Sequence, residues 1–256
     1  MEDRQAEQGE PLVVEEAAPE DGESRAGPED DAHGAPKLPE GLWRRLRADP
    51  AHAPQYLALA AVERWGEQAR DYARRVRAEH PAATNRELAA MVKSRHAVLA
   101  RMEGATAGLP ATAAPVVGAF ASVPPDLAAL AWIQCRMVVH IAAVYGADTT
   151  DPETAAELLV LQGFYNTTEA ARVALTEAGV RVATRLVNLY VKGSSLQLAK
   201  QLFRFVGIKF TRVWLLEAVP LVSIPISAIV NEGATRSLAN RAMKFYDLSP
   251  RSKKGE

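Results

Sequence analysis

The sequence predicts an all-α protein, a multi-helix bundle with two proline-broken apolar segments and a disordered acidic N-terminal tail. Composition is the first observation behind this prediction. Hydrophobic residues make up 48% of the 256 residues and aromatic residues 6%, and the apolar share leans on Ala, Leu and Val, which favour helices over a β-sandwich or barrel. Periodicity is the second, because apolar residues recur at steps of three and four along the chain, and no stretch shows the clean alternation of a half-buried strand.

The first 40 residues are the predicted disordered tail. They hold 13 acidic and 3 basic side chains, a net charge of −10, so the remainder carries +9 within a total of −1. Such a stretch buries too little apolar surface to offset its conformational entropy. Residues 41–248 form the predicted helical domain, and residues 249–256 a disordered basic C-terminal end. The acidic tail is either a solubilising segment or one that folds back on the basic body.

Two amphipathic helices are predicted in the first part of the domain. Residues 54–79 form the first, which ends at His80-Pro81 because the residue before a proline disfavours the helical region. Residues 85–102 form the second. The first helix places its apolar side chains at helical spacing, at Tyr56, Leu59, Val62, Trp65, Ala69, Tyr72 and Val76.

An apolar segment interrupted by prolines follows, from residue 108 to 125, and then an apolar helix over 127–145 that ends at Gly146, a favourable helix C-cap. Thr150-Asp151-Pro152-Glu153 is a helix start, and that helix reaches about residue 164. Further helices are predicted over 168–191 and 195–217. After Pro220, a second proline-broken apolar segment runs to residue 230, and the last helix covers 231–246.

Neither of the two most apolar windows is predicted to cross a membrane. A span needs about 20 largely apolar residues, and a central Arg costs about 2.5–3.5 kcal/mol on insertion scales. The window 127–145 contains Gln134, Arg136 and His140, so a buried core helix is the preferred interpretation. The window 213–230 contains Glu217 and two prolines, and can be an interfacial or re-entrant element.

The single cysteine, Cys135, lies in an apolar run, so no disulfide can form within the chain and nothing indicates an oxidising compartment. The first residues show no signal peptide, and a cytoplasmic location is expected, either soluble or peripheral to the inner membrane face. The basic residues between Arg172 and Trp214 do not form one stripe, so nucleic acid is not an expected partner. Diffuse positive charge suits anionic lipid headgroups better.

No nucleotide-binding, zinc-protease, Cys-x-x-Cys or nucleophile-elbow motif occurs, so no catalytic, cofactor-binding or metal-binding residue is predicted. One constellation remains, a polar seam of Asp126, Arg136 and His140, which fall within about 80° on one side of the apolar helix. Asn231 joins this seam in the prediction, because the two proline-containing segments are similar at an offset of 105 residues. The seam either binds a ligand or consists of an N-cap and two side chains satisfied by neighbouring helices, and the second interpretation is preferred.

Two segments together resemble the EcsC family. The first comprises Gly108-Leu109-Pro110, the Pro-Asp turn at 125–126, an apolar helix and a terminal Tyr-Gly-x-Asp at 145–148. The second comprises the segment that begins at Pro220, the Val-Asn pair at 230–231 and a helix ending in Ala242 and Tyr246, although Ser223 stands where the family has glycine. The resemblance is strongest over residues 85–248. The family-like residues are Pro110, Pro125, Asp126, Tyr145, Gly146, Pro220, Asn231 and Tyr246.

The resemblance implies a helical bacterial protein with membrane association and no established catalytic residues. The favoured hypothesis is a non-enzymatic accessory or regulatory protein that docks on the cytoplasmic membrane face or on a membrane protein such as a transporter. The first alternative is a soluble ligand-binding protein or hydrolase that uses Asp126, Arg136 and His140. The second is a helical scaffold for protein partners. No cofactor is expected in the favoured hypothesis.

Overall fold

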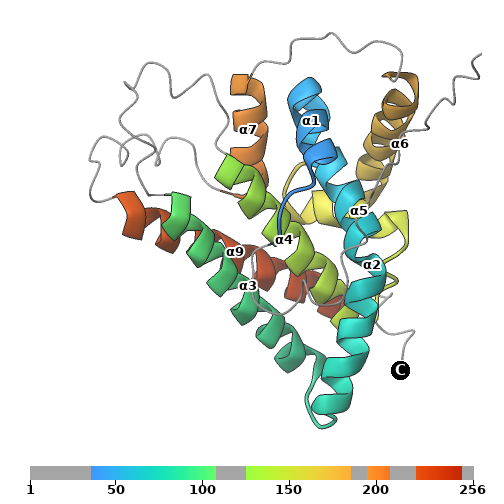
Figure 1. Cartoon of the computed structure of the whole chain (residues 1–256). Coiled ribbons are helices and arrows are strands. Elements are labelled where there is room, and N and C mark those ends of the chain that lie inside the picture. The colour runs from blue at the N-terminus through green and yellow to red at the C-terminus, as the bar shows by residue number, and fades with distance from the viewer. Residues whose placement is uncertain (1–35, 108–124, 186–194, 208–222, 250–256) are drawn as a thin grey trace, which may run out of the picture. The chain divides into compact units, whose positions relative to one another are not determined.

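The computed structural model describes residues 36–107, 125–185, 195–207 and 223–249. These residues form α-helices and a short 3-10 helix, with no strand among them, and the predicted all-α bundle is confirmed (Figure 1). The acidic tail before residue 36 and the apolar stretches 108–124 and 208–222 lie outside the described residues. The elements in chain order are α1 (Glu40–Ala48), η2 (Pro50–His52), α2 (Ala53–Glu79), α3 (Asn85–Ala107), α4 (Pro125–Val144), α5 (Pro152–Leu161), α6 (Thr168–Arg185), α7 (Ser195–Phe205) and α9 (Ser223–Leu248).

Helix α4 is the core helix of the domain. Helices α2, α3, α5, α7 and α9 all pack against it (Figure 1). Its Trp132 packs against Trp65 of α2, with 4.0 Å between the ring centroids. Among the described helices, the segment Leu127–Val144 is the one long and apolar enough to cross a membrane, and 94% of it is buried inside the fold. It therefore occupies the position predicted for a buried core helix.

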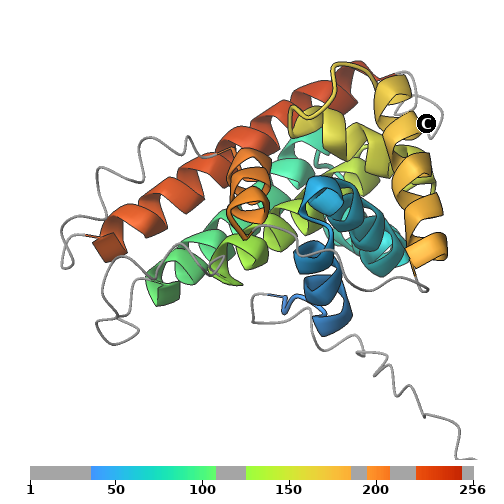
Figure 2. The ribbon, with the colours of Figure 1, turned by 90° about the horizontal axis from the view of Figure 1, so that it is seen from above.

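Helices α3 and α9 lie side by side and antiparallel (Figures 1 and 2). Lys93 Nζ donates a hydrogen bond to Asn240 Oδ1 at 3.2 Å. Eight residues further along α3, Arg101 Nη1 lies 3.7 Å from Glu232 Oε2, which is eight residues back along α9. The C-terminal end of α3 therefore lies beside the N-terminal end of α9.

Helix α9 runs parallel to α4. Gln134 Nε2 lies 3.4 Å from Thr235 Oγ1, and eleven residues later on both helices the rings of Tyr145 and Tyr246 stack with 6.4 Å between centroids. The N-terminal ends of α4 and α9 and the C-terminal end of α3 therefore meet at one end of the domain, which we call the apolar-segment end (Figure 1). Segment 108–124 connects α3 to α4 at this end, and segment 208–222 enters α9 there.

Several predicted boundaries are wrong. Helix α9 begins at Ser223 and not at residue 231, because Pro225 lies in the first turn, where its missing N–H removes no intrahelical bond. Helix α7 ends at Phe205 and not at residue 217, and Gly207 follows in the left-handed region with φ 73°. Helix α5 ends at Leu161, three residues early. Helix α3 continues to Ala107, beyond the predicted residue 102.

Candidate functional site

Arg136 and His140 lie one turn apart on α4 and are close to a second buried histidine, His96 of α3. All three are buried, with exposed fractions of 3–4%. The rings of His96 and His140 lie 5.7 Å apart, and the ring of Tyr72 on α2 packs edge-on against His140 at 5.1 Å. The structure therefore places a polar seam where α2, α3 and α4 meet.

Both histidines are oriented by the backbone of their own helix. His96 Nδ1 donates to the carbonyl oxygen of Val92, and His140 Nδ1 to that of Arg136, each at 2.9 Å. Because a carbonyl oxygen can only accept, Nδ1 carries the proton in each ring and Nε2 keeps its lone pair. His96 Nε2 has no hydrogen-bond partner among the described residues.

Burial keeps both imidazoles neutral. It lowers the pKa of His96 to about 3 and that of His140 well below its usual range, and the positive charges of Arg136 and Arg95 act in the same direction. Burial raises the pKa of Tyr72, against the lowering effect of Arg95 and Arg75. A general acid or base works best with a pKa near the operating pH. The environment of these groups is therefore that of a packed core.

The structure shows no contact with this cluster for Asn231, and it does not describe the side chain of Asp126. Asp126 is the second residue of α4, and its side chain lies outside the described part of the structure. Asn231 is half-buried on α9, one turn before Thr235, which meets Gln134. Gln134 and Arg136 lie about 160° apart around α4. Asn231 therefore shares the α9 face that meets Gln134, and a joint role for all four residues stays a prediction.

Three of the family-like residues hold the C-terminal end of α4. Gly146 adopts φ 81°, and the N–H of Ala147 donates to the carbonyl of Ala142 at 3.0 Å, which is a Schellman C-cap. Tyr145 stacks on Tyr246, whose hydroxyl donates at 3.0 Å to a buried carboxylate, Glu157 of α5. These residues therefore join α4, α5 and α9.

The remaining family-like residues are prolines. Pro125 is the first residue of α4, a position that favours proline because its N–H has no intrahelical partner. Pro110 and Pro220 lie outside the described residues.

The turn after α4 docks on α2. Asp148 Oδ1 accepts from the backbone N–H of Thr150 at 3.0 Å and from its hydroxyl at 2.7 Å. Thr149 Oγ1 donates to the carbonyl oxygen of Gly66. A Cβ added at Gly66 would collide with the carbonyl of Thr149, so the turn and the helix approach each other closely. Asp148 of the Tyr-Gly-x-Asp motif thus stabilises the turn that contacts α2 at Gly66.

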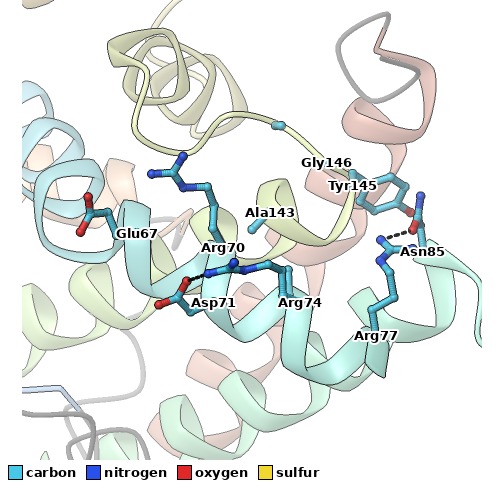
Figure 3. A pocket seen from close by; sticks show the side chains of 11 residues that line it. Glu67, Arg70, Asp71, Arg74, Arg77, Asn85, Ala143, Tyr145 and Gly146 are labelled. Atoms are coloured by element: carbon cyan, nitrogen blue, oxygen red, sulfur yellow. Dashed lines mark hydrogen bonds and ion pairs between the residues drawn. The ribbon is translucent and has the colours of Figure 1, made fainter. Parts of the chain in front are cut away.

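A cleft of about 690 Å³ lies where α2 passes the end of α4 (Figure 3). Arg77 donates to Asn85 Oδ1 and to the carbonyl of Val144, both at 2.8 Å, and so caps α4. Arg74 pairs with Asp71 on the cleft wall. The lining residues are Glu67, Arg70, Asp71, Ala73, Arg74, Arg77, Asn85, Ala143, Tyr145, Gly146 and Ala147.

Neither Arg136 nor His140 lines this cleft, so the seam and the cleft are separate features. Among the described residues no three His, Cys, Asp or Glu side chains are grouped to hold a metal ion. Burial raises the pKa of the Cys135 thiol, which disfavours the reactive thiolate.

Sequence reasoning missed His96, Glu157 and Gly66. His96 follows Leu88 and Val92 at steps of four, so a histidine within an apolar stripe was the available signal. For Glu157 and Gly66, the partners are Tyr246 and the turn after α4, which only the tertiary fold brings near.

A model of the EcsC protein family matches residues 59–248 of the chain. The match covers most of the chain. It includes α2 from residue 59 onward and so begins before residues 85–248, over which the resemblance in the sequence is strongest. Neither a curated protein nor a solved structure matches.

Proposed function

The chain belongs to the EcsC protein family, and on that premise we propose that it is a non-enzymatic accessory protein that associates with the cytoplasmic membrane face. One observation carries the proposal: both apolar segments join the helical domain at the apolar-segment end. The 17 residues 108–124 contain no charged side chain, and the 15 residues 208–222 contain three. One end of the domain therefore carries a concentration of apolar sequence.

The described residues next to these segments add to the support. Met102 on α3 and Ile229 on α9 are exposed large apolar side chains near this end, with exposed fractions of 56% and 64%. Apolar side chains beside cationic ones favour the boundary between headgroups and acyl chains. Segment 208–222 also contains Trp214, a residue type enriched at membrane interfaces.

A surface association fits this protein better than a spanning helix. The apolar helix long enough to span is α4, and its insertion would require five neighbouring helices to separate from it. The non-enzymatic part of the proposal is supported by the seam, where Arg136 and His140 are buried away from the cleft. A hydrolase would need such groups to reach a substrate.

Co-sedimentation with vesicles tests the proposal. We expect the full-length protein to bind vesicles of equal parts phosphatidylcholine and phosphatidylglycerol more strongly than neutral phosphatidylcholine vesicles. High salt should weaken this binding, because it screens exposed charges. A chain lacking residues 1–35 should bind anionic vesicles more strongly, because the deleted residues carry a net charge of −10. The deletion stops before Leu38, which packs against the core, so α1 is retained.

Absence of binding under every lipid and salt condition, with a folded protein by circular dichroism, would refute the membrane-surface proposal. Retention on native membranes but on no protein-free vesicle would point to a membrane protein as the docking partner.

A further inference from the structure

The exposed side of the α3–α9 pair carries a stripe of large apolar side chains. Six large apolar residues are exposed in the described part, and five of them lie on these two helices: Leu248 at the C-terminal end of α9 and four that make up the stripe. We call these four the α3–α9 stripe: Met91 (41% exposed), Val98 (53%), Met102 (56%) and Ile229 (64%).

Spacing and one ion pair place the four side chains along the helix pair. Met91, Val98 and Met102 follow one another at steps of seven and four on α3, so they project from one side of that helix. Ile229 lies one turn before Glu232, the residue of α9 that meets Arg101. Met102 and Ile229 therefore lie at a similar level along the helix pair, at the apolar-segment end.

The two helices that carry the stripe have an excess of positive charge. Together α3 and α9 carry seven Lys and Arg side chains and four Asp and Glu side chains. Glu232 is shared by two arginines, with its carboxylate oxygens 3.7 Å from Arg101 and 2.9 Å from Arg236. Lys93 is bonded to the neutral amide of Asn240. Over the whole helix pair, cations therefore outnumber carboxylates by seven to four.

The geometry points to the α3–α9 stripe as the surface that lies against an anionic bilayer. This inference rests on the proposed function and names the face that would carry it. Apolar side chains would enter the boundary below the headgroups, while Lys93, Arg101 and Arg236 reach lipid phosphates. Charge complementarity and continuity with the apolar-segment end favour a bilayer over an apolar protein groove, because such a groove would offer these three cations no anionic group beyond Glu232.

The chain offers a matched control position. Val173 on α6 is 55% exposed, close to the 53% of Val98, and both are valines within helices. The neighbouring Arg172 lies 3.3 Å from Glu153 and also pairs with Glu169, so the cation next to Val173 is matched by two carboxylates. Val98→Glu and Val173→Glu therefore make the same chemical change on two different faces.

The test measures the affinity of the full-length wild type, Val98→Glu and Val173→Glu for vesicles of equal parts phosphatidylcholine and phosphatidylglycerol. We expect Val98→Glu to weaken binding roughly tenfold or more, because a carboxylate replaces an apolar group at an anionic surface. Val173→Glu should bind as the wild type does. Ile229→Glu, a second position on the stripe, should repeat the loss, and thermal melts confirm that each variant is folded.

Wild-type affinity in both Val98→Glu and Ile229→Glu would overturn the assignment of this face and leave the proposed function intact. An equal loss in Val98→Glu and Val173→Glu would also overturn it, because the effect would then reflect net charge alone. If the folded wild type binds no vesicle, the proposed function fails together with this inference.

Discussion

Acidification from pH 6.5 to 4.5 is expected to lower the free energy of unfolding by up to about 1.4 kcal/mol per pH unit for each of His96 and His140. Burial lowers the pKa of both side chains in the folded state, that of His96 to about 3. In this window the unfolded chain binds protons that the folded chain does not. The contribution of the two neutral histidines to stability is therefore fully present above pH 6.5 and is lost as the pH falls. Urea unfolding at a series of pH values measures this slope.

Replacing one of the two imidazoles should flatten the slope. His96→Met places a flexible apolar side chain at this buried position and removes the titrating group. The variant should lose about half of the pH dependence between 6.5 and 4.5, whatever its absolute stability. His80→Gln, at an exposed position after α2, is the control for loss of a histidine and should keep the wild-type slope. A wild-type slope in His96→Met would show that the buried pair does not determine acid sensitivity.

Gly66→Ala is expected to destabilise the fold by about 1–3 kcal/mol, because the new methyl group meets the carbonyl of Thr149. The carbonyl of Thr149 is part of the backbone and cannot rotate away as a flexible side chain could. The turn after α4 must therefore move away from α2. That movement would also stretch the hydrogen bond from Thr149 Oγ1 to the Gly66 carbonyl. Thermal or urea unfolding of the purified variant gives the change.

The same substitution at Gly179 of α6 should have the opposite sign. Nothing lies within 4 Å of a Cβ added there, so only helix propensity acts, and Gly179→Ala should stabilise by about 0.5–1 kcal/mol. Stabilisation of both variants would contradict the close approach of the turn to α2. The pair separates a steric contact from the general effect of removing a helical glycine.

Local patterns in the sequence predict most of the helices. The spacing of Tyr56, Trp65 and Tyr72 predicts α2, and Gly146 predicts the end of α4. The period of the apolar residues predicts which side of a helix is buried, but it does not predict the residue at which the helix ends. Apolar spacing continues past Gly207 to Val213, yet α7 ends at Phe205.

The arrangement of the polar seam is harder to predict from the sequence than the fold is. Arg136 and His140 were identified because charged and polar groups in an apolar helix need partners. Their neighbour His96 comes from α3, and no local pattern joins two histidines 44 residues apart. The α3–α9 stripe likewise depends on an antiparallel pairing of helices that only the tertiary fold reveals.

The central claim is that the apolar-segment end contacts the membrane. Quenching of Trp214 fluorescence by brominated lipids tests this claim most directly. Trp65 and Trp132 are buried in the core, with exposed fractions of 3% and 1%, so lipid bromine should not reach them. On anionic vesicles, emission of the full-length protein should be quenched, and Trp214→Phe should abolish most of that quenching. Unquenched emission from protein that sediments with the vesicles would place another surface at the bilayer and contradict the account.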